Sequence, residues 1–253
     1  PRALPLKRCR PLLGTYVEIS VSNHPAAVAQ AFETIAHVQQ LMSLRVNTSD
    51  LSQINLLKAG QALSVHPWTW TVLHRALEIH QLTQGAFDCT DTGNMTALRL
   101  EEQNTIVLTK PIKLDLGGIA KGFAVDRAIE TLQSAGVEQA LVNAGGDLRV
   151  FGTTPILLTL RDPTHPSRVI PAGYLSNGAM ATSAPYFSLK KNQNKTTCAL
   201  INPFTRESIC DLKSYSILAP NCMDADALTK ALAVHRNPEA DYLNTYQAQA
   251  LLC

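Results

Sequence analysis

Residues 113–136 read KLDLGGIAKGFAVDRAIETLQSAG, and they contain the strongest local feature of the sequence. A short strand at residues 113–116 runs into two glycines, and a helix follows them. The helix has one apolar face with three- and four-residue spacing, and Gly136 ends it. That face is made of Val125, Ala128, Ile129 and Leu132. The stretch therefore predicts a strand that turns tightly into an amphipathic helix.

The segments on either side add helices and strands that do not alternate strictly. This order favours an α+β fold with a largely antiparallel sheet and flanking helices over a doubly wound parallel sheet. We expect residues 1–253 to form a single domain, with two closely packed lobes as the alternative. Residues 190–195, rich in lysine and asparagine, predict a surface loop. We predict helices at residues 25–42, 49–60, 67–84 and 225–235, strands at 15–21, 156–160, 179–183, 197–201 and 214–219, and a strand–turn–strand unit over 139–151.

The composition excludes several classes of function. Lys plus Arg number 22 and Asp plus Glu number 20, a formal net charge of +2, so electrostatics give no case for a nucleic-acid partner. No segment reaches the ~18 apolar residues that a transmembrane helix needs. Residues 1–11 contain no apolar run and therefore no signal peptide. Because the chain starts at Pro1 and not at a methionine, removal of an upstream segment stays a possibility.

The six cysteines are scattered and form no C-x-x-C pair, which leaves a zinc ribbon unsupported. Cys198 and Cys210 lie at equal distance from Phe204, on the two arms of an expected hairpin around residues 202–205. They either form a disulfide or are two buried thiols. We favour thiols, because unpaired cysteine is commonly buried.

Three turns are candidates for a ligand site. The glycines before the helix at 120 would let a phosphate approach the backbone and the first N–H groups of the helix, and Lys121 would add a positive charge. A plain tight turn explains the same residues equally well, and neither a Walker A loop nor G-x-G-x-x-G is present. Residues 143–147 (NAGGD) and 85–88 (GAFD) are ordinary turn sequences that could equally face a cleft.

The helix at 225–235 carries Asp226, Thr229 and Lys230. Asp226 and Lys230 are four residues apart and share one helix face, a spacing typical of a stabilising ion pair. A carboxylate beside a hydroxyl is also a ligand pair for Mg²⁺, but an ammonium on the same face repels a divalent cation.

Taken in order, these motifs resemble the ApbE-type FAD:protein FMN transferases. The resemblance covers nearly the whole chain. It rests on residues 13–15 (LGT), Met42-Ser43 with 49–55 (SDLSQIN), 85–88 (GAFD), 115–126 (DLGGIAKGFAVD), 142–147 (VNAGGD), 181–183 (ATS) and 201–205 (INPFT).

The resemblance implies an α+β fold related to the T-fold and a transferase that splits FAD with the help of Mg²⁺. Such an enzyme attaches FMN to a Thr or Ser of an acceptor flavoprotein and releases AMP. It also implies a periplasmic or membrane-associated location. By family position, Asp226 and Lys230 would be catalytic, and Gly118, Asp226 and Thr229 would hold the metal. The FAD contacts would be Leu13, Arg45, Ala86, Phe87, Asp88, Asp115, Lys121, Asn143, Gly145, Gly146, Asp147, Thr182 and Ile201.

Four positions depart from the family pattern. Arg45 stands where the family often has a tyrosine that stacks on a ring, and a guanidinium plane can also stack. Lys230 stands at the usual metal-site threonine. Ala199 replaces a histidine, and Asn202 replaces an aspartate. These differences keep two rival hypotheses open: a non-catalytic FAD-binding or flavoprotein-assembly protein on the same fold, and a hydrolase that cleaves FAD to FMN and AMP.

Overall fold

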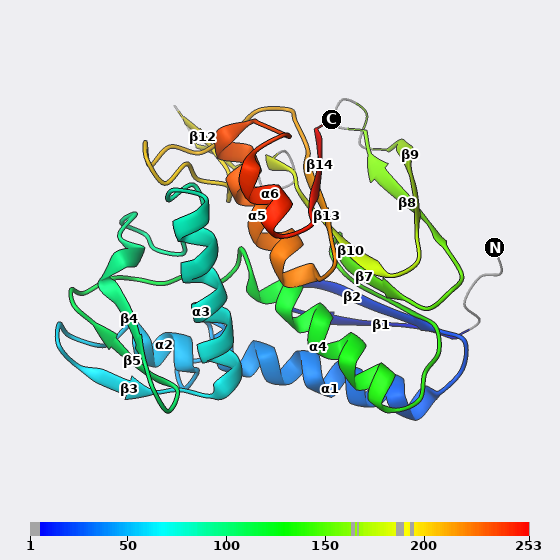
Figure 1. The fold of residues 1–253 in the computed structure, drawn as a ribbon, viewed down its shortest axis with the longest axis horizontal. Helices are drawn as coiled ribbons and strands as arrows, with labels where there is room; N and C mark the ends of the chain where they lie inside the picture. The colour runs from blue at the N-terminus through cyan, green and yellow to red at the C-terminus, as the bar shows by residue number, and fades with distance from the viewer. Residues whose placement is uncertain (1–5, 163–164, 166, 186–189, 193–194, 253) are drawn as a thin grey trace.

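A seven-stranded sheet in the order β1-β2-β6-β7-β10-β13-β14 is the largest layer of the computed structural model (Figure 1). The structure describes residues 6–162, 165, 167–185, 190–192 and 195–252. Each neighbouring pair in this sheet is antiparallel, which confirms the predicted α+β class. The strands are β1 (Leu6–Leu12), β2 (Thr15–Val21), β6 (Ala140–Ala144), β7 (Asp147–Phe151), β10 (Gly178–Ser183), β13 (Tyr215–Ala219) and β14 (Gln249–Leu252).

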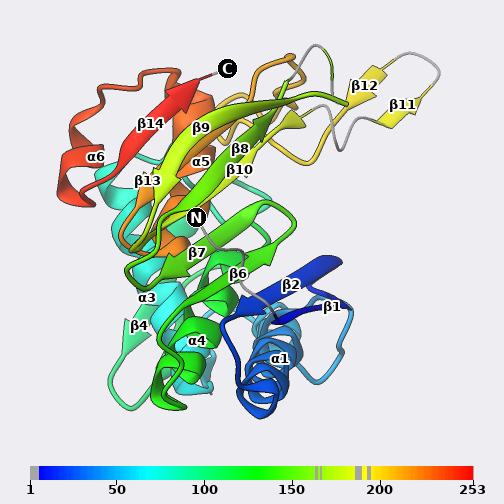
Figure 2. The same cartoon turned by 90° about the vertical axis from the view of Figure 1, so that its right-hand side faces the viewer.

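The two faces of this sheet are covered by different elements (Figures 1 and 2). Helices α1 (Pro25–Met42), α4 (Ala120–Ser134) and α5 (Cys222–His235) lie on one face, where α4 packs on β6 and β7 and α5 packs on β10 and β13. The hairpin of β8 (Ile156–Arg161) and β9 (Val169–Leu175) covers the other. Its Leu158 and Leu160 form a second buried cluster with Leu148, Val150 and Met180 of the sheet.

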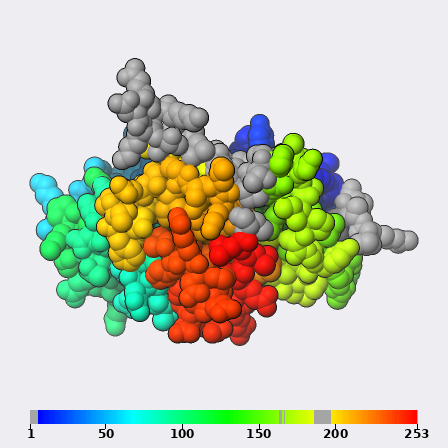
Figure 3. All heavy atoms as spheres, turned by 90° about the horizontal axis from the view of Figure 1, so that it is seen from above, coloured from blue at the N-terminus to red at the C-terminus, as the bar shows by residue number. Residues whose placement is uncertain are grey.

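A smaller unit packs at the far end of α1 and contributes to the same continuous buried core (Figure 1). It contains a three-stranded antiparallel sheet in the order β3-β5-β4. Its elements are α2 (Asp50–Ile54), β3 (Ala62–Ser64), α3 (Pro67–Leu82), the 3₁₀ helix η1 (Met95–Ala97), β4 (Leu98–Glu101) and β5 (Thr105–Leu108). The C-terminal α6 (Asp241–Thr245) and β14 share the face seen in Figure 3 with the segment around residue 205.

Helices α4 and α5 cross at Gly122, where there is no room for a side chain. A Cβ at this position would lie 2.2 Å from the carbonyl oxygen of Cys222. One turn further along α4, the carboxylate of Asp126 accepts hydrogen bonds from the N–H groups of Cys222 (2.9 Å) and Met223 (2.8 Å) and pairs with Arg149 at 2.8 Å. These contacts place the first turn of α5 against the first turn of α4. They thereby bring together the side chains of the site described below.

The main predicted elements are present, with differences at their ends. The helix predicted at 25–42 has those bounds, whereas α2 ends at Ile54, and α5 begins three residues earlier than predicted because the Asn221 side chain caps it by accepting from the N–H of Asp224. The strand predicted at 113–116 is reduced to a single antiparallel bridge between Leu114 and Thr90, in which the N–H of Asp115 donates to the carbonyl of Cys89 and the N–H of Asp91 donates to that of Lys113.

Two predictions near the end of the sheet also need correction. The predicted loop at 190–195 contains β11 (Lys190–Asn192), which pairs with β12 (Lys195–Thr197). The strand predicted at 197–201 is wrong, because β12 already ends at Thr197.

Cys198 lies beside Cys210, and both are thiols. Burial, together with a hydrogen bond to Cys210, raises the pKa of Cys198 to about 11.

Candidate functional site

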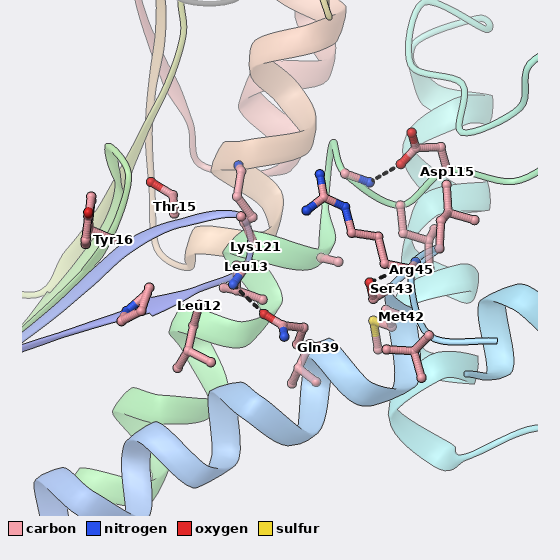
Figure 4. Close-up of a pocket in the computed structure, with 18 residues that line it drawn as sticks. Leu12, Leu13, Thr15, Tyr16, Gln39, Met42, Ser43, Arg45, Asp115 and Lys121 are labelled. Carbon is pink, nitrogen blue, oxygen red and sulfur yellow. Dashed lines mark hydrogen bonds between the residues drawn. The ribbon is translucent and has the colours of Figure 1, made fainter. Parts of the chain in front are cut away.

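A cavity of about 660 Å³ opens between the tip of the β1–β2 hairpin, the end of α1 and the turn that precedes α4 (Figure 4). This volume is in the range of pockets that hold a cofactor-sized molecule. The walls are largely aliphatic, with a few polar and charged groups. The lining residues are Pro11, Leu12, Leu13, Gly14, Thr15, Tyr16, Val38, Gln39, Met42, Ser43, Leu44, Arg45, Val46, Asp115, Leu116, Gly117, Ala120 and Lys121.

The hairpin tip is a two-residue turn in an uncommon conformation. Leu13 (φ 56°) and Gly14 (φ 72°) both have positive φ between the paired residues Leu12 and Thr15, as the I′ type of hairpin turn requires. A leucine rarely adopts this backbone region. The side chain of Gln39 holds the turn in place, because its Oε1 accepts a 2.6 Å hydrogen bond from the backbone N–H of Leu13.

Arg45 projects into the cavity from the loop that follows α1 (Figure 4). Ser43 shapes this loop: its hydroxyl accepts from the N–H of Arg45 at 3.2 Å, and its carbonyl accepts from the hydroxyl of Ser49 at 2.8 Å. The Arg45 guanidinium makes no hydrogen bond, ion pair or ring contact within the described residues. It is therefore an uncommitted cation that can pair with a phosphate or stack on a ring.

The turn before α4 forms the opposite wall. Asp115 accepts a 2.8 Å hydrogen bond from the N–H of Gly117 through its side chain, so the carboxylate stabilises the turn that the two glycines make. Lys121, in the first turn of α4, also lines the cavity. This wall confirms the part of the prediction that placed a tight turn ahead of a helix.

Behind Lys121 lie two carboxylates and a second lysine. The ammonium of Lys121 pairs with Asp147 and lies 3.5 Å from Oδ2 of Asp226. That same Oδ2 accepts from the N–H of Gly122 at 3.1 Å. The ammonium of Lys230 pairs with Oδ1 of Asp226 and donates to the Asp226 carbonyl at 2.9 Å.

The pKa values of this network follow from its burial and its charges. Burial acts to raise the pKa of Asp226, but the two lysines overcome it and hold the pKa below its ordinary value. Burial and the charge of Asp226 raise the pKa of Asp147. Burial acts to lower the pKa of Lys121, and the two carboxylates raise it well above its ordinary range instead. Lys121 is thus a permanent cation at the cavity wall.

The ApbE family model matches residues 13–98 and 91–252, which together span almost the whole chain. The chain belongs to the ApbE family. It is 27% identical to the FAD:protein FMN transferase of Vibrio cholerae over 88% of this chain and 79% of that protein. It is 25% identical to the enzyme of the same name from Rhodobacter capsulatus, of which it spans only 50%. The crystal structure of the ApbE protein from Thermotoga maritima superposes with a TM-score of 0.84 at 25% identity, over 98% of this chain and 93% of that one.

Four of the predicted ApbE site residues line the cavity: Leu13, Arg45, Asp115 and Lys121. Gly118, Asp147, Asp226 and Lys230 lie directly behind Lys121, as the contacts above describe. A β6–β7 turn supports this group. In it, Oδ1 of Asn143 accepts from the N–H of Gly146 at 2.9 Å, and Gly145 packs so closely on Thr15 that a Cβ would lie 2.5 Å from the Thr15 hydroxyl. The FAD contacts proposed for Asn143, Gly145, Gly146 and Asp147 stay predictions.

The remaining predicted residues lie outside the cavity lining. Ala86 and Phe87 are buried, and Asp88 orders its own loop by accepting from the N–H (2.6 Å) and hydroxyl (2.5 Å) of Thr90. Ile201 is exposed in a bridge to Ser208. The hydroxyl of Thr182 bonds that of Ser216 across the sheet at 2.8 Å. Their predicted contacts with FAD stay predictions.

Thr229 does not face the Asp226 carboxylate. Its hydroxyl is buried, 2.7 Å from the carbonyl oxygen of Asp226 and 2.7 Å from the hydroxyl of Ser183 on β10. This geometry argues against the metal-binding role expected for Thr229. Within the described part of the chain, no group of three or more His, Cys, Asp or Glu side chains is placed to hold a metal ion.

Several lining residues were not predicted. Gln39 is the most informative, because it ties α1 to the hairpin, and Thr15, Tyr16 and Ser43 complete the rim. Gln39 sits between the apolar positions of a helix, where a polar residue is unremarkable. Its role follows from the contact of its side chain with Leu13, a residue 26 positions away in the sequence, which sequence patterns do not reveal.

Proposed function

We propose that this chain is an FAD:protein FMN transferase. One observation carries the proposal: an aliphatic cavity offers two cationic side chains, Arg45 and Lys121, and both are among the FAD contacts that the family resemblance implies. The curated relatives that match most of the chain bear the name of this activity. The substrates would be FAD and an acceptor flavoprotein.

The reaction transfers the FMN group of FAD to a hydroxyl oxygen of the acceptor. The hydroxyl oxygen of an acceptor Thr or Ser attacks the FMN phosphorus of FAD, and the bond from that phosphorus to the bridging oxygen breaks. AMP leaves with the bridging oxygen and its electron pair, and the hydroxyl proton is released. The negative charge that grows on the leaving AMP is what catalysis must stabilise.

The chain provides groups suited to binding and charge stabilisation. Leu12, Val38 and Met42 offer apolar surface for a ring system, while Lys121 and Arg45 are placed to pair with the pyrophosphate. Asp147 and Asp226 hold Lys121 charged and fix its direction. Lys121 is therefore proposed as a catalytic residue, and the two aspartates as its positioning residues.

The family resemblance also implies magnesium, but the residues present do not suit a metal ion at Asp226. Oδ1 of Asp226 is paired with the ammonium of Lys230, and Oδ2 accepts from Gly122 and faces Lys121. Both carboxylate oxygens are thus engaged by cationic or N–H donors.

A second candidate is an FAD-binding or flavoprotein-assembly protein that does not catalyse transfer. Ala199 and Asn202 favour it, because the family resemblance places a histidine and an aspartate at these positions. A third is hydrolysis of FAD to FMN and AMP, which needs no acceptor. The three candidates differ in their products.

The test titrates the purified protein with FAD while flavin fluorescence and AMP are measured, with and without co-expressed candidate acceptor flavoproteins. AMP release together with a covalently flavinylated acceptor supports the transferase. AMP release with free FMN and no labelled acceptor identifies the hydrolase. FAD binding without AMP, in the presence of acceptors, favours the assembly protein and contradicts the transferase.

For location, we propose the periplasm or the membrane surface, a proposal supported by the family resemblance alone. No helix in the described ranges has both the length and the apolar character needed to cross a membrane. Fractionation of cells that carry the tagged, full-length protein tests the proposal, and recovery in the cytoplasm alone would contradict it.

A further inference from the structure

The ammonium of Lys230 lies on the same carboxylate that the family resemblance assigns to a metal ion. It pairs with Oδ1 of Asp226 and donates to the Asp226 carbonyl at 2.9 Å. The lysine thus contacts two oxygens of one residue, the kind of oxygen pair that a hard cation would use. Asp226 is fully buried, whereas the Lys230 side chain is partly exposed.

The helix geometry explains why Lys230 and not Thr229 reaches this position. Residues four apart on an α-helix share a face, whereas each single step rotates the side chain by ~100°. Lys230 therefore points back over Asp226, while Thr229 turns toward Ser183 on β10. A threonine at 230 would be on the face that Lys230 now occupies.

Gly118 leaves the space for the stem of the lysine. A Cβ at Gly118 would lie 3.3 Å from Cε of Lys230, so the aliphatic chain of Lys230 runs against bare backbone. Gly118 follows Gly117, which lines the cavity. The ammonium is consequently held at the edge of the same wall from which Lys121 projects.

The charges of the network already balance. Asp147 and Asp226 contribute two negative charges, and Lys121 and Lys230 contribute two positive ones. A divalent cation beside Asp226 would meet two ammonium groups at short range in a buried setting, where repulsion between like charges is strong. It would also have to displace Lys230 from the carboxylate.

We infer that Lys230 is a built-in cation that replaces the divalent metal at Asp226, so that this chain acts on a pyrophosphate substrate with two lysines and no metal ion at that carboxylate. The inference rests on the proposed function for its substrate. Lys230 adds positive charge beside Lys121 where charge accumulates on the leaving AMP. The lysine at position 230 of this chain is therefore what takes the place of a metal ion at Asp226.

The first test measures metal binding without any reaction. Binding of Mn²⁺ to the FAD-free protein is followed by electron paramagnetic resonance for the wild type, K230T and K230M. K230T frees the Asp226 carboxylate and supplies an oxygen, so it should bind Mn²⁺ at least about tenfold more tightly than the wild type. K230M is the matched control, because it removes the ammonium without adding a ligand, and it should bind less tightly than K230T. Wild-type binding as tight as that of K230T, and lost in D226N, would overturn the inference.

The second test separates this inference from the proposed function. With FAD and a candidate acceptor flavoprotein present, AMP release by the wild type should be the same in EDTA and in Mg²⁺, whereas AMP release by K230T should require Mg²⁺. Wild-type AMP release that requires Mg²⁺ would overturn the role of Lys230 while the proposed function stands. If the wild type releases no AMP in either condition, the proposed function fails, and the Mn²⁺ comparison still decides which cation occupies the site.

Discussion

The backbone N–H of Leu13 donates to Oε1 of Gln39 at 2.6 Å, and this contact fastens the tip of the β1–β2 hairpin to α1 across the mouth of the cavity. Leu13 holds a left-handed backbone conformation that a leucine seldom adopts. Such conformations persist where the surroundings enforce them, and they concentrate at functional sites. The I′ turn requires this conformation, and the hydrogen bond from Gln39 supports it.

Gln39→Ala should therefore loosen the hairpin tip and weaken FAD binding. The loss of one hydrogen bond costs about 1 kcal/mol, which corresponds to a decrease in FAD affinity of about fivefold. Fluorescence titration with FAD measures this change. Gln40→Ala, at the exposed neighbouring position of the same helix, is the control and should leave the affinity unchanged. Equal affinities for the two variants would mean that the turn does not need its tether.

Arg45 should contribute to FAD affinity because its guanidinium is uncommitted and faces the cavity. Arg45→Ala is expected to reduce the affinity about tenfold or more, as for the loss of a charge-assisted contact. Arg45→Tyr distinguishes its two possible contacts: recovery of affinity indicates stacking on a ring, and no recovery indicates a phosphate contact. Arg99→Ala, on β4 and outside the cavity lining, serves as the control. An unchanged affinity in Arg45→Ala would remove Arg45 from the site.

Lys121 should stabilise the fold as well as bind ligand. Lys121→Met leaves two buried carboxylates short of a partner and should lower the free energy of unfolding by about 3–5 kcal/mol. Adding Asp147→Asn removes one of those charges and should recover part of the loss, which urea denaturation of the single and double variants measures. Lys110→Met, at an exposed position, should have little effect. Strict additivity of the two substitutions would contradict the coupling.

Asp126 should make stability depend on pH. Burial raises its pKa from 3.8 to about 6, even though Arg149 and two backbone N–H groups act to lower it. Between these two values the folded state binds a proton that the unfolded state has released, so stability falls as pH rises from 4 to 6. The contribution is about 3 kcal/mol in total.

Asp126→Asn isolates this effect, because it cannot titrate. The free energy of unfolding of the wild type, measured relative to that of the variant, should decrease steadily from pH 4 to pH 6 and then level off. A difference that stays constant over this range would show that Asp126 is ionised in the folded state throughout.

The helices were the part of the fold that the amino-acid sequence predicted best, because apolar residues recur with the helical period. The apolar spacing in residues 25–42 and 120–134 is local information, and α1 and α4 follow it closely. The short strands of the smaller unit, β4 and β5, were missed because four-residue strands leave little alternation to detect. The strand predicted at 113–116 is reduced to one antiparallel bridge to Thr90, because the turn formed by Asp115 and Gly117 follows it directly.

The four-residue spacing of Asp226 and Lys230 matches the helical repeat, so the amino-acid sequence alone predicts that they share one face of a helix. The contact of Lys121, 105 residues away, with the same carboxylate depends instead on tertiary packing. That meeting depends on the close crossing of α4 and α5 at Gly122 and on the β6–β7 turn that delivers Asp147. Side-chain spacing within one helix is a local property, whereas the charge balance of a buried cluster is set by which elements pack together.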